Sequence, residues 1–244
     1  MPAIAASVTV AMTAENAQIA ATDPAFAQPR PRAEETTAMT HVSNEIKSQT
    51  QPVRAGPRRA RPGEAIGTKL DQQLLEGTGT APQIRGLRNQ SGILATSLAT
   101  NGRAPTIDDV ADAIGRMEGR NANCTAIIMS PRTWATYRKV ADTTSRYQLS
   151  PDPSIDGTKS LFGVPVFTSS QISTSETSGT NSDCSWIGFV DTARWIVARR
   201  KEVELAYSPH FKFDYDQVSI RAIARFDAGL IDTASAELIT GVRP

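Results

Sequence analysis

The sequence has few of the features that hold small or secreted folds together. Its 244 residues contain two cysteines, Cys124 and Cys184, too few for a disulfide framework and not spaced as metal ligands. We expect both to be reduced, partly buried thiols. No run approaches the ~18 consecutive apolar residues of a membrane span, and the start lacks the basic segment of a signal peptide. These absences predict a cytoplasmic product with no membrane partner.

An excess of charge of one sign is also lacking. Lys and Arg number 26 and Asp and Glu number 25, so the net charge is +1, which gives no long-range attraction to nucleic acid. Hydrophobic residues make up 39% and charged residues 21%, as in ordinary globular proteins with a core. The tryptophans Trp134, Trp186 and Trp195 stand far apart, which favours core or interface positions over a base-stacking platform.

Catalytic patterns are scarce. The histidines are His41 and His210, and no Gly-x-Ser-x-Gly turn presents a serine nucleophile. His41 lies in an alternating segment typical of a strand, and His210 lies in a turn. A hydrolase therefore requires one of them to lie beside a serine or an aspartate. We otherwise expect neither an enzyme nor a cofactor.

Two polar patterns have structural explanations. The segment GTGTAPQIRG lacks the Gly-Lys-Ser/Thr of a phosphate loop and the third glycine of a dinucleotide site, so it predicts a flexible loop. Asp108, Asp109 and Asp112 form the one close acidic cluster. Two of the three lie in the first turn of a predicted helix, where the helix dipole favours carboxylates. Helix capping is thus predicted rather than a metal site.

Helix signals lie in the middle of the chain. EAIGTKLDQQLLEG has an apolar face and a stop at Gly77. TIDDVADAIGRMEGR begins with Thr106 as N-cap and Asp109 completing a capping box. Ser130 and Pro131 begin another helix, expected to reach about Ala141.

Strand signals dominate the rest. Residues 7–12 and 125–129 and the segments FGVPVFTS, SWIGFVD, VELAY and QVSIRAIAR predict strands. The Ser/Thr-rich segment SSQISTSETSGTNSD predicts a loop, and no internal repeat is evident. The sequence therefore predicts an α+β fold.

The order of these segments resembles the HK97-type major capsid proteins of tailed bacteriophages. AENAQIAATDPAFAQ resembles the family's extended E-loop, and AMTHVSNE resembles the strand that returns from it. LDQQLLEGTGTAPQIRGL resembles the end of the long spine helix with its glycine-rich loop. The segments from TIDDVADAI to VSIRAIARFDAGLIDTASAELI complete the order. This resemblance implies an HK97-like fold with a peripheral (P) and an axial (A) domain.

The resemblance also implies a division of the chain. Residues 1–47 correspond to the E-loop and returning strand, and 48–104 to a spine-helix remnant and glycine-rich loop of the P domain. Residues 105–200 correspond to the A domain and 201–244 to P-domain strands. Self-assembly contacts are expected in the E-loop and in a loop facing the ring axis, at Glu15, Asn16, Asp23, Phe26, Tyr147, Asp152, Asp156 and Lys159.

Two windows depart from the family pattern. Residues 52–63 contain three prolines, two glycines and four arginines, which disrupts the expected spine helix. Residues 29–37 stand where a strand of the returning arm is expected. Both windows have the Arg/Pro/Ala bias of a gene read out of frame, and the match lacks the family's N-terminal arm, so we interpret the chain as a truncated or partly frameshifted copy. No asparagine follows Asn181, so no C-terminal acceptor for a covalent crosslink is expected.

The implied function is that of a structural subunit, made in the host bacterial cytoplasm and located in the virion capsid. It is expected to form pentamers and hexamers with itself that enclose DNA loosely, with a portal, a scaffold and a maturation protease as further partners. An encapsulin-like compartment and a nonfunctional prophage remnant are the alternatives. A cryptic hydrolase is the alternative from a different class.

Overall fold

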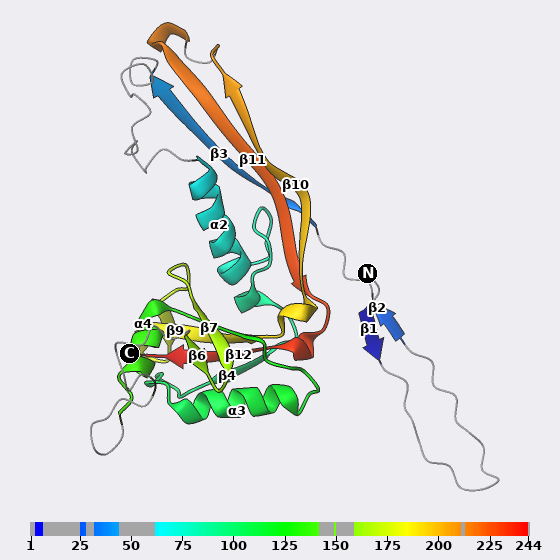
Figure 1. Ribbon diagram of the computed structural model, residues 1–244, viewed down its shortest axis with the longest axis vertical. Coiled ribbons are helices and arrows are strands. Elements are labelled where there is room, and N and C mark those ends of the chain that lie inside the picture. The colour runs from blue at the N-terminus through cyan, green and yellow to red at the C-terminus, as the bar shows by residue number, and fades with distance from the viewer. Residues whose placement is uncertain are drawn as a thin grey trace, which may run out of the picture.

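Strands from distant parts of the sequence form two sheets in the computed structural model (Figure 1). The structure describes residues 3–6, 25–27, 32–43, 62–141, 149, 159–210 and 213–243, with the backbone alone described for 3–6, 25–27, 62, 63 and 213. The larger sheet and its helices α3 and α4 form what we call the seven-stranded body. The smaller sheet and helix α2 form the three-stranded body. A short pair, β1 (Ala3–Ala6) and β2 (Ala25–Ala27), stands apart from both.

The seven-stranded sheet has the order β4-β12-β9-β5-β7-β6, with β8 added to β9. Its strands are β4 (Leu94–Ser97), β5 (Ala126–Met129), β6 (Ser160–Leu161), β7 (Val164–Thr168), β8 (Glu176–Ser178), β9 (Asn181–Val190) and β12 (Ala236–Val242). The β4/β12 and β5/β7 pairs are parallel and the other pairs are antiparallel. The parallel strand β5 is short, branched and buried, as such strands are when both faces of a sheet are covered.

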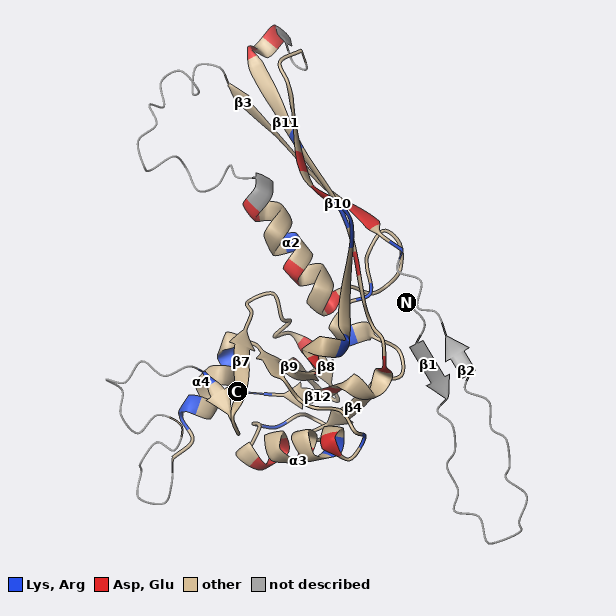
Figure 2. Cartoon of the chain, turned by 45° about the vertical axis from the view of Figure 1, so that its right-hand side comes forward, with Lys and Arg blue, Asp and Glu red and all other residues tan. Residues whose placement is uncertain are grey.

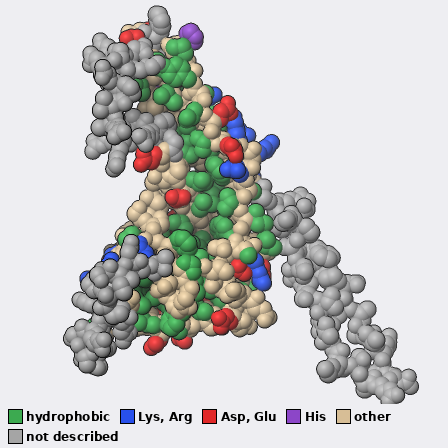
Figure 3. Space-filling model, viewed as in Figure 1, with side chains coloured by type: hydrophobic (Ala, Val, Ile, Leu, Met, Phe, Trp, Pro, Cys, Tyr) green, Lys and Arg blue, Asp and Glu red, His purple; other side chains and the backbone are tan. Residues whose placement is uncertain are grey.

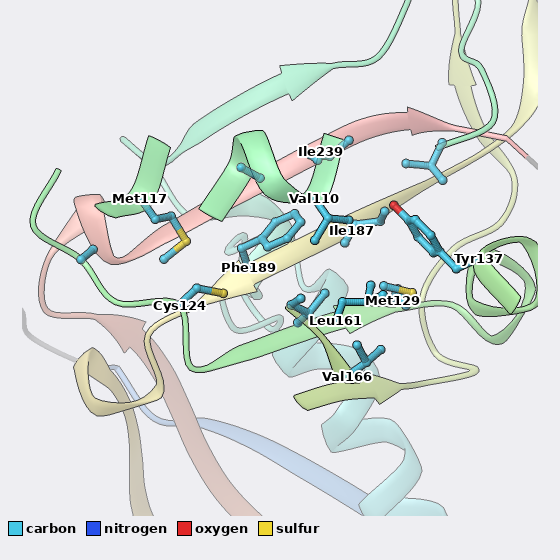
Figure 4. Close-up of a cluster of buried hydrophobic side chains, with 14 residues drawn as sticks. Val110, Met117, Cys124, Met129, Tyr137, Leu161, Val166, Ile187, Phe189 and Ile239 are labelled. Carbon is cyan, nitrogen blue, oxygen red and sulfur yellow. The ribbon is translucent and has the colours of Figure 1, made fainter. Parts of the chain in front are cut away.

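Helices α3 (Ile107–Glu118) and α4 (Pro131–Arg138) cover one face of this sheet. Val110, Ala113 and Met117 recur at helical spacing and are fully buried. They pack with Phe189 and other side chains from β5, β9 and α4 in the largest apolar cluster (Figure 4). Each large side chain removed from water in this way contributes roughly 1.5–3 kcal/mol. The predicted N-caps of both helices are confirmed.

The opposite face of the sheet packs around Trp186, which is fully buried. The glycine-rich segment and the short helix η2 (Leu87–Asn89) contribute Leu87 to this cluster. The sequence predicts a flexible loop here, but backbone hydrogen bonds hold the segment in place. Gly79 N–H donates to Ile84 O (3.1 Å), and Gly86 N–H donates to Gly77 O (2.9 Å). A Cβ at Gly77 would lie 2.2 Å from the carbonyl oxygen of Ile84. Glycine is therefore required there by close backbone approach.

The three-stranded sheet has the order β10-β11-β3 and is antiparallel throughout. Its strands are β3 (Glu34–Ser43), β10 (Trp195–Ser208) and β11 (Gln217–Leu230), with a short helix η4 (Phe213–Tyr215) before β11. Helix α2 (Pro62–Glu76) places Ile66 and Leu70 against Ala222, Ala224 and Phe226 of β11. The predicted alternation of β11 is thus confirmed, since its even positions are packed and Arg221 is exposed.

The end of α2 is tied to the seven-stranded body. The Glu76 carboxylate accepts from the indole N–H of Trp186 (2.8 Å) and from the backbone N–H of Ser173 (2.7 Å). A buried indole N–H requires such a partner. Glu76 therefore anchors the C-terminal end of α2.

Several sequence-based expectations need correction. Glu34 to Thr37 form the start of β3 in regular register with β11, so the strand expected to be missing at residues 29–37 is present there. The Ser/Thr-rich loop contains β8 and the start of β9. The helix expected to reach Ala141 ends at Arg138.

Other expectations lie at or beyond the edge of what the structure describes. Pro62 is the first residue of α2, while residues 52–61 and the predicted strand at 7–12 lie outside the described residues. The division of the chain into P and A domains stays a prediction. However, its boundary at 200/201 falls inside β10, and β12 pairs with β4 and β9 rather than with the strands of the three-stranded sheet.

The α3 cap predicts a pH-dependent stabilisation. Burial alone would raise the pKa of Asp109, but hydrogen bonds from Arg103 and Thr106 outweigh it and hold the pKa below its ordinary value of 3.8. A lowered folded-state pKa stabilises the fold above the unfolded pKa, and this contribution is lost as the pH falls through the folded pKa. We expect Asp109→Asn to lower the free energy of unfolding by about 1 kcal/mol at pH 7 and by less near pH 3 in urea titrations. The exposed Asp112→Asn should show neither effect.

The Glu237 carboxylate predicts a larger loss. It is fully buried in β12 and accepts from Arg116 Nε (2.7 Å) and Arg120 Nη2 (2.9 Å). Arg116 and Arg120 are 36% and 29% exposed, so their charges stay partly hydrated without Glu237. Charge-assisted hydrogen bonds contribute about 1.5–3 kcal/mol, so Glu237→Gln should lower the free energy of unfolding by about 2 kcal/mol. Glu35→Gln is the control, because Glu35 pairs with Arg225 on the surface, where a pair contributes about 0–1 kcal/mol. Equal losses in urea unfolding would contradict this assignment.

Candidate self-assembly surfaces

The predicted contact residues lie mostly beyond the described part of the chain. Glu15, Asn16, Asp23, Tyr147, Asp152 and Asp156 fall outside it, and Phe26 is described by its backbone alone, in β2 opposite Ile4. Lys159 is exposed, and its Nζ donates to Thr168 Oγ1 (2.9 Å) across the β6–β7 hairpin. The structure therefore places one predicted side chain, at the base of that hairpin. It does not test whether the eight residues make contacts.

Strand β10 presents a surface that the sequence did not single out. Its far edge pairs with no other strand among the described residues. An unpaired edge exposes a row of backbone donors and acceptors that another chain can use. Two register shifts against β11 interrupt the strand between Arg199 and Glu204, and this stretch contains basic and acidic residues, coloured blue and red in Figure 2. Beyond the shifts, Leu205 to Ser208 form a regular, mostly uncharged edge.

The side chains of this regular part continue an apolar face. Leu205 lies opposite Ala222 and Tyr207 lies opposite Ile220, so both point to the side of the sheet that α2 covers. Helix α2 packs over β3 and β11, and Leu205 and Tyr207 remain 62% and 54% exposed. Figure 3 shows hydrophobic side chains gathering along the sheet beside α2. Exposed apolar patches of this kind mark protein interaction sites.

The β6–β7 hairpin exposes two aromatic side chains. Phe162 and Phe167 are each 58% exposed. Phe162 and Gly163 form the two-residue turn, and both have positive φ, 49° and 78°. Positive φ is unfavourable for a bulky side chain, so the turn holds an aromatic ring outward at some conformational cost. This hairpin forms one edge of the seven-stranded sheet.

An apolar groove of about 460 Å³ lies where the two bodies meet. Leu74 and Leu75 of α2 form one wall, and Ile128 and Phe167 of the sheet form the other, with Trp195 at the start of β10. The groove leaves the two bodies incompletely packed on this side.

The candidate catalytic groups form no accessible centre. His41 Nδ1 lies 2.9 Å from Ser219 Oγ, which meets the first requirement of the hydrolase alternative. However, Ser219 is only 3% exposed, so a substrate cannot reach its hydroxyl, and the two residues are opposite partners on β3 and β11. His210 is exposed in the turn after β10. The pair is therefore interpreted as a cross-strand contact.

The cysteines and acidic cluster have structural roles as well. Cys124 and Cys184 are free and buried, 5% and 0% exposed, and burial raises the pKa of the Cys124 thiol to about 11. A thiol with a raised pKa is a poor nucleophile at neutral pH. Asp109 is engaged by Arg103 and Thr106. No group of three or more metal-ligating side chains occurs in the described ranges, and no described helix is long and apolar enough to cross a membrane.

Comparisons with known proteins agree on one kind of protein. The capsid of a native GTA particle, computed with C5 symmetry, matches with a TM-score of 0.79 at 15% identity over 99% of this chain and 84% of that chain. A chain of Mycobacterium phage Adephagia matches with a TM-score of 0.74 at 14% identity over 100% and 84%. A chain of Mycobacterium phage Ogopogo gives 0.73 at 14% over 98% and 85%. The curated proteins contain no match.

The structural likenesses confirm the α+β, HK97-like capsid fold that the sequence predicted. In addition, the model of the family described as "Phage capsid family" matches residues 1–241, nearly the whole chain. The chain therefore belongs to the phage capsid family and is a structural capsid subunit.

Proposed function

We propose that copies of this chain assemble into pentamers and hexamers, which close into an icosahedral shell around viral DNA. The observation that carries the proposal is the extent of the structural match, which spans both bodies and at least 98% of the chain in three capsid or phage structures. One of these, the GTA capsid, was computed with C5 symmetry, which is consistent with five-fold rings. A shell requires repeated contacts between copies, so function is distributed over surfaces.

The contacts are proposed at three places. The apolar face of β10, with Leu205 and Tyr207, meets a neighbouring copy because a free edge and exposed apolar side chains coincide there. The proposed E-loop contributes Glu15, Asn16, Asp23 and Phe26 to a second neighbour contact. The loop before β6 contributes Tyr147, Asp152, Asp156 and Lys159 around the ring axis.

Contacts with other components are proposed to be weaker. The net charge of +1 suits a container that encloses DNA without condensing it, because tight DNA binding requires many Lys and Arg contacts to phosphates. A portal, a scaffold and a maturation protease are the proposed protein partners. The subunit is proposed to be made in the cytoplasm of the bacterial host and to end in the virion.

Assembly is tested directly on the purified chain. We expect negative-stain electron microscopy and size-exclusion chromatography to show uniform shells or capsomer rings. A monodisperse, folded monomer at all protein concentrations would contradict the proposal and favour a nonfunctional remnant.

The β10 face predicts a variant that blocks assembly without unfolding the subunit. Leu205 is 62% exposed, so Leu205→Asp should change the free energy of unfolding by less than about 0.5 kcal/mol. At an interface the same substitution buries an unpaired carboxylate, so rings and shells should be lost in electron micrographs. Leu205→Met, which keeps the side chain apolar, is the control and should assemble. Shells of normal yield from Leu205→Asp would exclude this face as a contact.

A further inference from the structure

Two short segments of the chain share a sequence pattern. Residues 188–193 read Gly-Phe-Val-Asp-Thr-Ala, and residues 229–234 read Gly-Leu-Ile-Asp-Thr-Ala. The first segment ends β9 and leads into β10, and the second ends β11 and leads into β12. Each therefore stands where a strand leaves one sheet and enters the other.

Both segments fold in the same way. Thr192–Arg194 form the 3-10 helix η3, and Thr233–Ser235 form the 3-10 helix η5. In η3 the Asp191 side chain accepts from the N–H of Ala193 (3.1 Å). In η5 the Asp232 side chain accepts from the N–H of Ala234 (2.9 Å). The shared Asp-Thr-Ala sequence thus forms the same capped turn twice, because an aspartate before a turn satisfies the free N–H groups of that turn.

The two turns are bonded to each other. Asp191 N–H donates to Ser235 O (2.8 Å), and Ile231 N–H donates to Arg194 O (3.0 Å). On either side of the turns, Val190 pairs with Ala236 in one sheet and Trp195 pairs with Leu230 in the other. The antiparallel ladder therefore continues across the junction, with a matched turn in each strand.

The residue after Asp-Thr-Ala differs in chemical character between the two copies. Arg194 follows the first Asp-Thr-Ala, where the second copy has Ser235. Arg194 Nη1 lies 2.7 Å from Asp232 Oδ2, and Nε lies 3.5 Å from Asp191 Oδ2. Its Nη2 also donates to Asn121 O (3.2 Å), just beyond α3. One guanidinium therefore joins both turns to the seven-stranded body.

Two apolar side chains of the junction, Trp195 and Leu230, also pack against the Trp186 cluster of the seven-stranded body. The chain passes between the bodies at η3, at η5 and after Glu76, where α2 ends. The apolar groove of about 460 Å³ lies between α2 and the seven-stranded sheet, and Thr192 and Trp195 line it. On the side of the groove, however, the space between α2 and the sheet is not filled by side chains, which leaves room for relative movement of the two sheets.

We propose that the paired turns and Arg194 form a clamp that sets the angle between the two sheets, and through it the curvature of the shell. The effect on curvature rests on the proposed function. The effect on the angle is a property of the single chain. Arg194 is a positioning residue in this proposal, since it acts through the orientation of the bodies.

Changes in the angle between the two sheets can be detected in the unassembled subunit from the distance between two spin labels. Labels are placed at Thr37→Cys on β3 and Asp112→Cys on α3, both exposed. The two natural cysteines are buried and should not react. We expect Arg194→Ala to raise the population of a second inter-label distance about five-fold, equivalent to about 1 kcal/mol. Asp232→Asn keeps a side-chain oxygen that can accept from Ala234 N–H but removes the charge that pairs with Arg194. It should therefore also raise the population of the second distance. This variant keeps the proposal testable if Arg194→Ala does not fold.

Arg225→Ala is the matched control. Arg225 and Glu35 have side chains 43% and 38% exposed, close to the 37% and 43% of Arg194 and Asp232, but both lie within one sheet. The control should leave the distances unchanged. Distances in Arg194→Ala and Asp232→Asn that match the wild type, or an equal change in Arg225→Ala, would overturn the clamp.

The effect on curvature is read from particle diameters in electron micrographs. We expect the wild type to give one diameter, Arg194→Ala to give a mixture and Arg225→Ala to match the wild type. If Arg194→Ala alters the inter-label distances but not the particle diameters, the link to shell curvature is overturned and the clamp itself is retained. A wild type that forms no particles refutes the proposed function, whereas the distances still decide the clamp.

Discussion

The sheets share two continuous stretches of backbone, β9 into β10 and β11 into β12, and the rest of the structure depends on that constraint. The seven-stranded sheet is not complete until the end of the chain has been placed, because β12 lies between β4 and β9. Thr96 and Thr240, which are hydrogen-bonded, stand 144 positions apart. Pairings of such separation are expected to form slowly, since a long loop must close before any contact is gained. Strands β10 and β11 of the three-stranded sheet lie between β9 and β12 in the chain, so the seven-stranded body closes around them although each body has its own apolar cluster.

Signals within a few neighbouring residues were sufficient to predict where helices α3 and α4 begin and which positions of strand β11 are packed. Thr106 with Asp109, and Ser130 with Pro131, marked where α3 and α4 begin, because capping involves residues within one turn. The register of β3 required tertiary information. The Arg/Pro/Ala bias of residues 29–37 favoured an interruption in the strand. The pairing of Glu34 to Thr37 with β11, where Glu35 meets Arg225, is visible only once the strands lie side by side.

The same limit applies to β12 and to the contact surfaces. A carboxylate inside a central strand is unfavourable unless it is paired, and the partners of Glu237 stand more than 100 positions earlier, on and just after α3. The alternation around Leu205 predicted a strand with one packed face. That β10 is an edge strand, left uncovered by α2, is a property of the assembled sheet. Sequence reasoning therefore found the family and the elements, while the exposed face of β10 came from the structure.

The proposed function places the same subunit in rings of five and rings of six, which requires the subunit to adjust its shape at some place. The apolar clusters are poor places, because close-packed side chains resist deformation. The junction differs, since the Arg194–Asp232 ion pair that joins its two turns is 37% and 43% exposed, and a pair with that exposure rearranges at a cost of about 0–1 kcal/mol. At the opposite side of the groove, Glu76 holds the end of α2 to the fully buried Trp186. With the end of α2 anchored in this way, we infer that release of the Arg194 clamp would allow the bodies to rotate about the end of α2. Such a rotation changes the width of the groove while leaving both sheets intact.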